Sequence, residues 1–434
     1  MEGLYFHSNF ADSSAVEIGD SVGHITLQHW DFGQEVLRSD THYIYIGNPY
    51  YLLIQNLTFL DFSDDHTGVL DTTMIYISSV NLSTEGIINV TNMTVSNCSI
   101  SFLHLASVTG HTEVQKYILF DYVNIIDATF SSYNDLIIFG PMYTVEDVEM
   151  HMNHFTFDNL NFEKRANILH LKQQSLNPFV LENSVFQNMQ GGRILVEPLT
   201  VSEDSVLSQL HLENVTVTNN DFKDSTFIVL EEHCDLVITG CYMYKNSATF
   251  RGTLLSIVDS NSHVNITDWK FNNNNGMIGG LFYVNGNSPI YIYDSSFFSN
   301  FAISAPISYI TNQGSAHFIS WDFTLNKALS VGLFENIDSI VATSLEHCNF
   351  YENEIVAASV ITEELDDRTH WVNLWFAADS YFDYLDATRS ILDIVVSFQT
   401  LIYRSPTHCF RQLKQLLISM RDEYSMTWSK YLLL

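Results

Sequence analysis

Positive charge is scarce in this chain: its 434 residues include 18 Lys and Arg against 50 Asp and Glu, a formal net charge of -32. A surface this acidic repels nucleic acids, anionic lipid headgroups and polyanionic sugars. We therefore expect no nucleic-acid partner, and a solvated acidic surface accounts for the excess charge without any special site. Charged residues make up only 16% of the chain and hydrophobic residues 46%, which predicts a large core and excludes disorder.

Cysteines and long apolar runs are also few. No two of the five cysteines form a CxxC pair, so no zinc framework is predicted. The longest apolar stretch, 391–403, is short and contains Asp393, so no membrane span is expected in this chain. The first ten residues lack the basic and apolar regions of a signal peptide. Because a repeat already begins at Phe6, we expect a fragment of a longer protein, whose leader and anchor would lie elsewhere.

What the chain does contain is an internal repeat. An apolar residue, two variable positions and an Asn are followed by a short polar or small segment, often with Gly, and then by an apolar run, as in FNNNNGMIGGLFYV from Phe271. The repeat is regular from about residue 183, and weaker copies end at Asn9, Asn97 and Asn159. The anchoring residues of the regular part, 26 to 32 positions apart, are Asn188, Asn220, Asn246, Asn274, Asn300, Asn326 and Asn353.

The pattern inside each unit predicts strands. Apolar and polar residues alternate with a period of two, and β-branched and aromatic residues are abundant. Stacked units of this kind predict an all-β fold, a right-handed parallel β-helix solenoid with coils of about 26–32 residues. We assign 1–404 to this solenoid, with less regular coils before about residue 183.

Equivalent positions of successive units should stack on one another. The position three before the Asn predicts an apolar core stack, which starts at Val185 and is clearest at Phe271, Phe297, Phe323 and Phe350. The Asn column predicts a ladder of hydrogen-bonded amides at a corner with left-handed backbone, which Asn tolerates. The position five before the Asn has a mixed composition, which predicts that it lies near a corner; its residues are Asn183, Val215, Cys241, Trp269, Ser295, Trp321 and Cys348.

The motif resembles two groups of known proteins. An F-x-x-N segment followed by Gly-Gly and an apolar run resembles the repeats of polymorphic outer membrane proteins, and it is similar to the pectin-lyase-type β-helix of large protist surface proteins. The resemblance covers Val185 to Ile361 best, although the Gly-Gly half is degenerate. It implies adhesive or surface-scaffold roles, with a signal peptide and membrane anchor elsewhere in the parent chain.

The last segment, 405–434, departs from the repeat. Its apolar residues are spaced for one face of a helix: Phe410, Leu413, Leu416, Leu417, Met420 and Tyr424. Because solenoids need their open ends covered, we expect a short C-terminal helix that caps the β-helix. A partner-binding helix and a non-native end are the alternatives.

Candidate chemistry is sparse. Asp268 and Asp294 occupy the same register in successive units, which we interpret as a corner feature. Asp64-Asp65-His66 and Asp366-Asp367 are expected to be solvated turns, with cation sites as the alternative. Glu231–Asp235 carries metal-capable residue types, but adjacent strand residues point to opposite faces, so few could share one ion. His151 and His154 should likewise point to opposite faces of a strand. We expect no catalytic residue, metal or cofactor. Seven N-x-S/T sequons are candidate N-glycosylation acceptors: Asn56, Asn81, Asn89, Asn92, Asn97, Asn214 and Asn265.

These features favour a non-enzymatic function. We expect a structural or adhesive β-helix segment of an extracellular or cell-surface protein, binding an unknown protein or glycan ligand through its long faces. The alternative is a carbohydrate-active enzyme of the pectin-lyase type, a polysaccharide lyase or hydrolase. An enzyme should bring three or more carboxylates or bases together across neighbouring coils.

Overall fold

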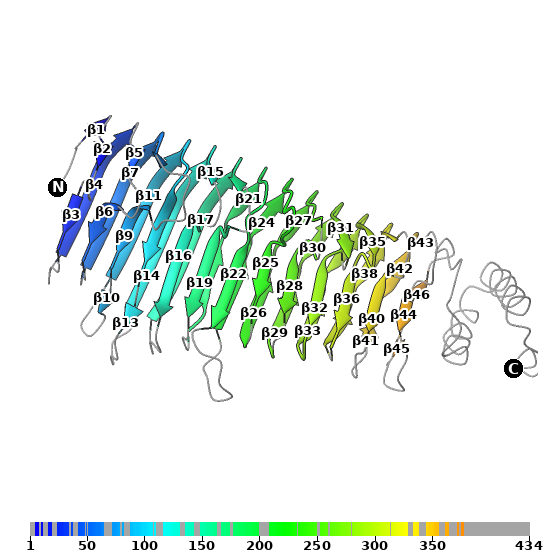
Figure 1. Ribbon diagram of the computed structural model, residues 1–434. Coiled ribbons are helices and arrows are strands. Elements are labelled where there is room, and N and C mark those ends of the chain that lie inside the picture. The colour runs from blue at the N-terminus through cyan, green and yellow to red at the C-terminus, as the bar shows by residue number, and fades with distance from the viewer. Residues whose placement is uncertain are drawn as a thin grey trace, which may run out of the picture.

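The computed structural model is an elongated solenoid of parallel strands (Figure 1). It describes the strands and most corners between Tyr5 and Phe376. It leaves out 1–4 and 377–434, single residues and pairs along the chain, and these longer segments: 12–15, 20–23, 38–41, 65–71, 82–86, 110–115, 131–134, 143–147, 163–165, 174–176, 199–207, 329–332, 338–343, 356–360 and 364–370.

The largest sheet, sheet 1, runs the length of the solenoid. Its strands are β1 (Tyr5–His7), β4 (His24–Gly33), β7 (Tyr51–Leu60), β11 (Ile87–Ser96), β14 (Lys116–Ile126), β17 (Val148–Asp158), β20 (Phe179–Glu182), β21 (Val185–Gln187), β23 (Ser208–Glu213), β24 (Thr216–Thr218), β26 (Cys234–Thr239), β27 (Tyr242–Tyr244), β29 (His263–Thr267), β30 (Lys270–Asn272), β33 (Pro289–Tyr293), β34 (Ser296–Phe298), β37 (Ser315–Ile319), β38 (Asp322–Thr324), β41 (Ser344–Glu346), β42 (Asn349–Tyr351), β45 (Trp371–Val372) and β46 (Trp375–Phe376).

Sheet 2 forms a second long face. Its strands are β3 (Val16–Ile18), β6 (His42–Ile46), β9 (Thr73–Ile77), β10 (Val80–Asn81), β12 (Ser101–Leu105), β13 (Val108–Thr109), β16 (Ile137–Met142), β19 (Leu169–Gln173), β22 (Ile194–Pro198), β25 (Ile228–Leu230), β28 (Leu255–Val258), β32 (Phe282–Asn285), β36 (Ser308–Thr311), β40 (Phe334–Ile337) and β44 (Ile361–Glu363).

Short strands between the two sheets make a third face. They form three small sheets, which contain β2 (Phe10–Ala11), β5 (Val36–Leu37) and β8 (Ser63–Asp64); β15 (Thr129–Phe130) and β18 (Asn161–Phe162); and β31 (Asn275–Ile278), β35 (Phe301–Ser304), β39 (Lys327–Ala328) and β43 (Glu354–Ile355). The expected all-β, right-handed parallel β-helix is confirmed as the fold. Residues 405–434, the expected cap, lie outside the described residues.

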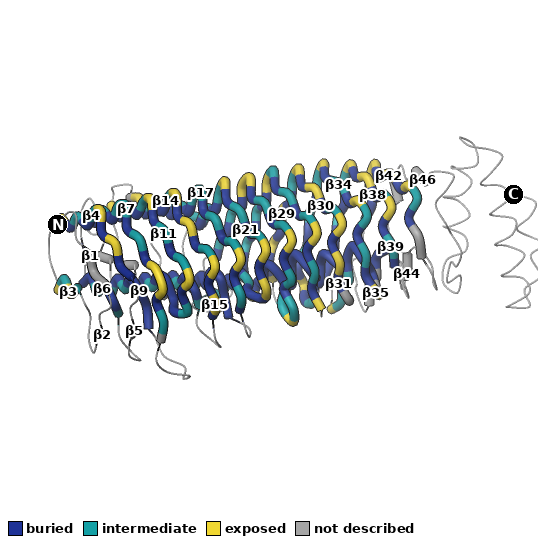
Figure 2. The backbone as a smooth tube through the Cα atoms, turned by 90° about the horizontal axis from the view of Figure 1, so that it is seen from above, coloured by how far each residue is buried: buried dark blue, intermediate teal, exposed yellow. Residues whose placement is uncertain are grey.

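Two columns of left-handed residues shape each coil. The first corner divides the sheet 1 strand of each coil, and its residues have φ of 48–63°, as at His154 within β17 and Asp294 between β33 and β34. The second corner follows sheet 1, with φ of 49–58°, as at Asn159 and Asn273. Exposed residues recur at these corners in successive coils (Figure 2).

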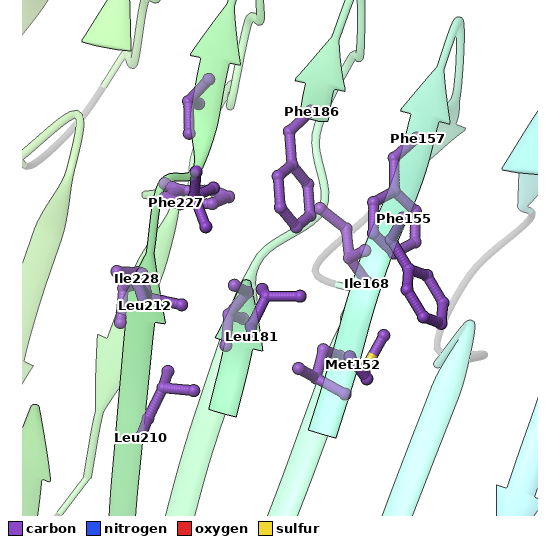
Figure 3. Packing of buried hydrophobic residues seen from close by; sticks show 14 of the residues in the cluster. Met152, Phe155, Phe157, Ile168, Leu181, Phe186, Leu210, Leu212, Phe227 and Ile228 are labelled. Carbon is purple, nitrogen blue, oxygen red and sulfur yellow. The ribbon is translucent and has the colours of Figure 1, made fainter. Parts of the chain in front are cut away.

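The interior is a continuous apolar core. One column of sheet 1 carries the aromatic stack, in which the Phe271 and Phe297 rings lie 4.9 Å apart and the Phe323 and Phe350 rings 4.7 Å apart. We expected Val185 in this stack, but Val185 is only half-buried. The stack residue of that coil is the next one, Phe186 (Figure 3). The column continues through Val217 and Met243 and, toward the N-terminus, through Phe157, Ile125, Val95, Phe59 and Phe32.

Immediately after the second corner, buried asparagines form a chain of hydrogen bonds along the axis. Asn274 Nδ2 donates to Asn300 Oδ1 at 3.1 Å and to the Met243 carbonyl at 3.2 Å. Its own Oδ1 accepts from the backbone N–H and the Nδ2 of Asn246. All four hydrogen-bonding positions of the amide are therefore used. The same links join Asn220, Asn246, Asn274, Asn300, Asn326 and Asn353.

Two details of the expected ladder were wrong. Asn188 is exposed, has a left-handed φ of 56° and donates to Asp158, so it belongs to the corner column and Met189 fills the interior position. The left-handed residue is also not the ladder Asn but the residue before it, such as Asn273. The left-handed corner residue and the inward-facing amide are therefore two successive residues of the chain rather than one.

Candidate functional site

Sheet 2 presents one row of outward-facing residues across successive coils. On β22, Ile194 and Val196 are fully buried in the core, so Leu195 between them faces outward. This outer row consists of Tyr45, Tyr76, His104, Ile138, His170, Leu195, Val229, Ser256, Tyr283 and Tyr309. From His170 to Tyr283 its members are only 5–8% exposed, so the outward row is recessed there.

An acid–base chain crosses three coils at this row. His170 lies between Asp135 and Glu197, with Nδ1 2.6 Å from Asp135 Oδ2 and Nε2 2.9 Å from Glu197 Oε2. The side chains of His170 and Asp135 are 10% and 14% exposed, whereas that of Glu197 is 37% exposed. We call this group the His170 bridge. It brings acid–base groups from three neighbouring coils together at His170 of the outer row.

Neighbouring polar groups hold the bridge in place. Asp135 Oδ1 accepts hydrogen bonds from the backbone N–H of Asn167 at 3.0 Å and from its Nδ2 at 2.6 Å. Arg193 Nε donates to Asn167 Oδ1 at 2.7 Å, and Lys172 Nζ lies 3.8 Å from Glu197. Both ring nitrogens of His170 already face a carboxylate, so the imidazole has no nitrogen free for a substrate. The bridge as it stands links coils rather than presenting an acid and a base.

A second set of histidines and acids lies on the outer face of sheet 1. His151 Nδ1 lies 3.5 Å from Glu182, and His263 Nδ1 lies 3.3 Å from Asp235. Burial lowers the pKa of His211, and burial raises the pKa of Asp235 against the attraction of His263. No group of three or more such residues in the described part of the chain is arranged to hold a metal ion.

The structure places the other sequence candidates individually. Asp268 and Asp294 are exposed left-handed residues of the first corner. His151 and His154 both lie on the outside, because the left-handed conformation of His154 reverses the strand alternation, so the expectation of opposite faces was wrong.

Three further clusters are described only in part or not at all. In Glu231–Asp235, Glu231 is exposed, whereas Cys234 is buried. Asp65, His66 and the Asp366-Asp367 pair lie outside the described residues.

The four described cysteines are buried free thiols. Burial raises the pKa of Cys98, Cys241 and Cys348 to about 12, and it raises that of Cys234 as well. The thiolate is the nucleophilic form of Cys, so these residues are unreactive at neutral pH. Cys409 lies outside the described residues.

The sequons follow from the geometry of the coils. At Asn56, Asn92 and Asn214 the Asn is the left-handed residue of the first corner, and the next residue is buried. Asn97 has the same arrangement at the second corner, where its Nδ2 donates to Asp61. Asn89 and Asn265 are outward residues of strands, followed by an inward and then an outward residue. The sequon pattern thus follows from alternation. Asn92, Asn97, Asn214 and Asn265 are exposed, whereas Asn56 and Asn89 are half-buried. Asn81 lies in β10, and its side chain is not described.

A family model supports the fold, and two other known proteins are similar to the chain. Residues 145–355 match the family model for a right handed beta helix region. A transmembrane domain-containing protein of Dictyostelium discoideum is 22% identical over 94% of this chain, which spans only 27% of that relative's length. Among solved structures, the A-module of a mannuronan C-5 epimerase from Azotobacter vinelandii aligns with 79% of this chain and 90% of its own, with a TM-score of 0.34 and 10% identity. Within the described residues no helix is long and apolar enough to cross a membrane. The fold is a right-handed parallel β-helix.

Proposed function

We propose that this chain is a non-enzymatic structural or adhesive β-helix segment of an extracellular or cell-surface protein. The observation that carries the proposal is the His170 bridge, in which both ring nitrogens are already bound by carboxylates. The outer row also contains half-buried tyrosines, among them Tyr45, Tyr76 and Tyr309, which offer aromatic contacts for a glycan or protein ligand.

The parent protein is part of this proposal. The Dictyostelium relative carries a transmembrane domain in its name, and this chain spans about a quarter (27%) of its length. An anchor outside the present segment would hold the solenoid at a membrane surface. The exposed sequons at Asn92, Asn214 and Asn265 would then carry glycans.

A carbohydrate-active enzyme remains the second candidate because one observation favours it. Asp135, His170 and Glu197 converge across neighbouring coils, as such an enzyme requires. Catalysis would need one of these groups to leave its partner and contact the sugar. Glu197 is the best placed, since its side chain is 37% exposed.

One experiment separates the two candidates. The full chain is tested for binding to a glycan array and to cells, and in parallel for new reducing ends or unsaturated products from neutral and acidic polysaccharides. We expect binding that Tyr309→Asp abolishes, with no product formed. Polysaccharide turnover that disappears in Glu197→Gln would establish the enzyme instead. The matched control is Val237→Asp, an outward half-buried Val of sheet 1, which should bind normally.

A further inference from the structure

Large apolar side chains gather on one edge of the last coils. Phe298 and Tyr351 occupy the same outward position of sheet 1, two coils apart, with Thr324 between them. Leu325 follows Thr324 at the second corner, and Ile303 lies on the third face just beyond that corner. As whole residues, Phe298, Leu325, Tyr351 and Ile303 are 40–42% exposed. We call these four residues the corner patch. Clustered exposed apolar residues mark contact surfaces.

The surroundings of the corner patch are acidic. Between residues 291 and 355 the chain has seven Asp and Glu residues, and Lys327 is its only basic residue. Asp322 and Glu346 are exposed, and Glu352 is half-buried, all on the coils that carry the patch. A partner for this surface therefore needs an apolar face flanked by positive charge.

Residues 405–434 have this composition. Their apolar positions recur at helical spacing, for example Leu413, Leu417 and Met420. Four basic residues accompany them (Arg411, Lys414, Arg421 and Lys430) against two acidic ones, in a chain that is strongly acidic elsewhere. Two coil spacings cover about 10 Å, which is about two turns of a helix. One helical face can therefore span the patch.

We propose that residues 405–434 dock through their apolar face on the corner patch, along the side of the last coils. The described solenoid ends at β46, which pairs with β42, the strand of Tyr351. The last described strand therefore lies beside the patch. Docking at this edge would cover exposed apolar surface and pair basic with acidic side chains.

Cross-linking through Cys409 tests the proposal in the full chain. Thr324→Cys places a thiol within the corner patch, and the described native thiols do not compete because they are buried with raised pKa values. The matched control is Thr218→Cys, a half-buried Thr in the same outward column four coils away. The 32 residues between 376 and 409 could extend about 100 Å, so an undocked segment would reach both sites.

We expect a short bismaleimide to link Cys409 to the Thr324→Cys site at least about fivefold faster than to the Thr218→Cys site, because docking raises the effective concentration. Equal rates, or no link to the Thr324→Cys site, would overturn the proposal. Cross-linked dimers at the Thr324→Cys site would also overturn it, because a second copy would then occupy the patch.

Trypsin provides an independent readout at Arg411 and Lys414. Introducing Phe298→Asp and Leu325→Asp together should accelerate cleavage there about tenfold, since it releases the segment. Leu60→Asp is the control, because Leu60 lies in the same outward column as Phe298 and is 42% exposed. If the paired variant keeps the wild-type melting temperature and its cleavage rate does not change, the segment is not docked on the patch.

Discussion

The two halves of the solenoid fill the interior of the second corner with different chemistry. In the earlier coils this position is apolar or a thiol: Phe62, Cys98, Ala128, Leu160 and Met189. In the later coils it is Asn at each corner that the structure describes, from Asn220 to Asn353. Both solutions are buried within the same fold.

The difference shows when a buried amide is tolerated. A lone interior Asn would lack partners for part of its amide, which costs about 1–3 kcal/mol for each orphaned group. In the later coils the next Asn supplies those partners at 2.9–3.1 Å. A buried Asn is therefore tolerated at this position only when the neighbouring coils also carry Asn. An apolar residue packs there whatever the neighbouring coils carry. The run also has nearly constant spacing, 26–28 residues, against 36 and 32 at two earlier corners.

Interrupting the ladder should have the largest effect. Asn300→Leu removes the acceptor of the backbone N–H and Nδ2 of Asn274 and the donor to the Phe271 carbonyl. We expect a loss of about 3–5 kcal/mol in the free energy of unfolding, measured by urea denaturation. Asn273→Ser is the control and should cost less than about 1 kcal/mol, since Ser299 has the same left-handed conformation one coil later. Equal melting temperatures for the two variants would show that the ladder does not stabilise the fold.

Moving the boundary between the halves should have an intermediate effect. Met189→Asn would extend the ladder, because its Nδ2 could donate to Asn220 Oδ1, which already accepts from the Met189 N–H. Leu160→Asn introduces the same amide where the next coil offers Met189 instead. We expect Leu160→Asn to be less stable than Met189→Asn by about 1–3 kcal/mol, as measured by thermal and urea unfolding. Similar losses in both variants would mean that the amides act independently rather than as a run.

The fold could be predicted largely from one half of the molecule. The regular Asn spacing and the phenylalanines at 271, 297, 323 and 350 identify stacked parallel coils, and the family match covers 145–355. The earlier coils share the geometry but not the motif, since their corner interior is apolar and their spacing varies. Alternation still predicts their strands, yet no repeated residue marks where one coil ends.

The candidate site could not be predicted in the same way. Asp135 and Glu197 lie 35 and 27 residues from His170, on a sheet where neighbouring coils repeat no common motif. Their contact depends on the register between β16, β19 and β22. That register is set by connecting loops of unequal length. The sequence signal available was only the outward position of His170 between two apolar residues, and many surface histidines share it.

The smallest expected effect concerns corner asparagines that the sequence pattern does not distinguish from ladder residues. Asn97, Asn159 and Asn188 resemble ladder residues in the sequence but are exposed corner residues one position earlier. Asn188→Ser should therefore cost less than about 1 kcal/mol, the loss of one exposed hydrogen bond to Asp158. Asn220→Ser should cost several times more, because Asn220 Nδ2 donates to both Asn246 and the Phe186 carbonyl in the interior. If urea unfolding gave equal losses for the two variants, Asn188 would contribute as a ladder residue does, and the boundary between the apolar and amide halves would lie one coil earlier than we place it.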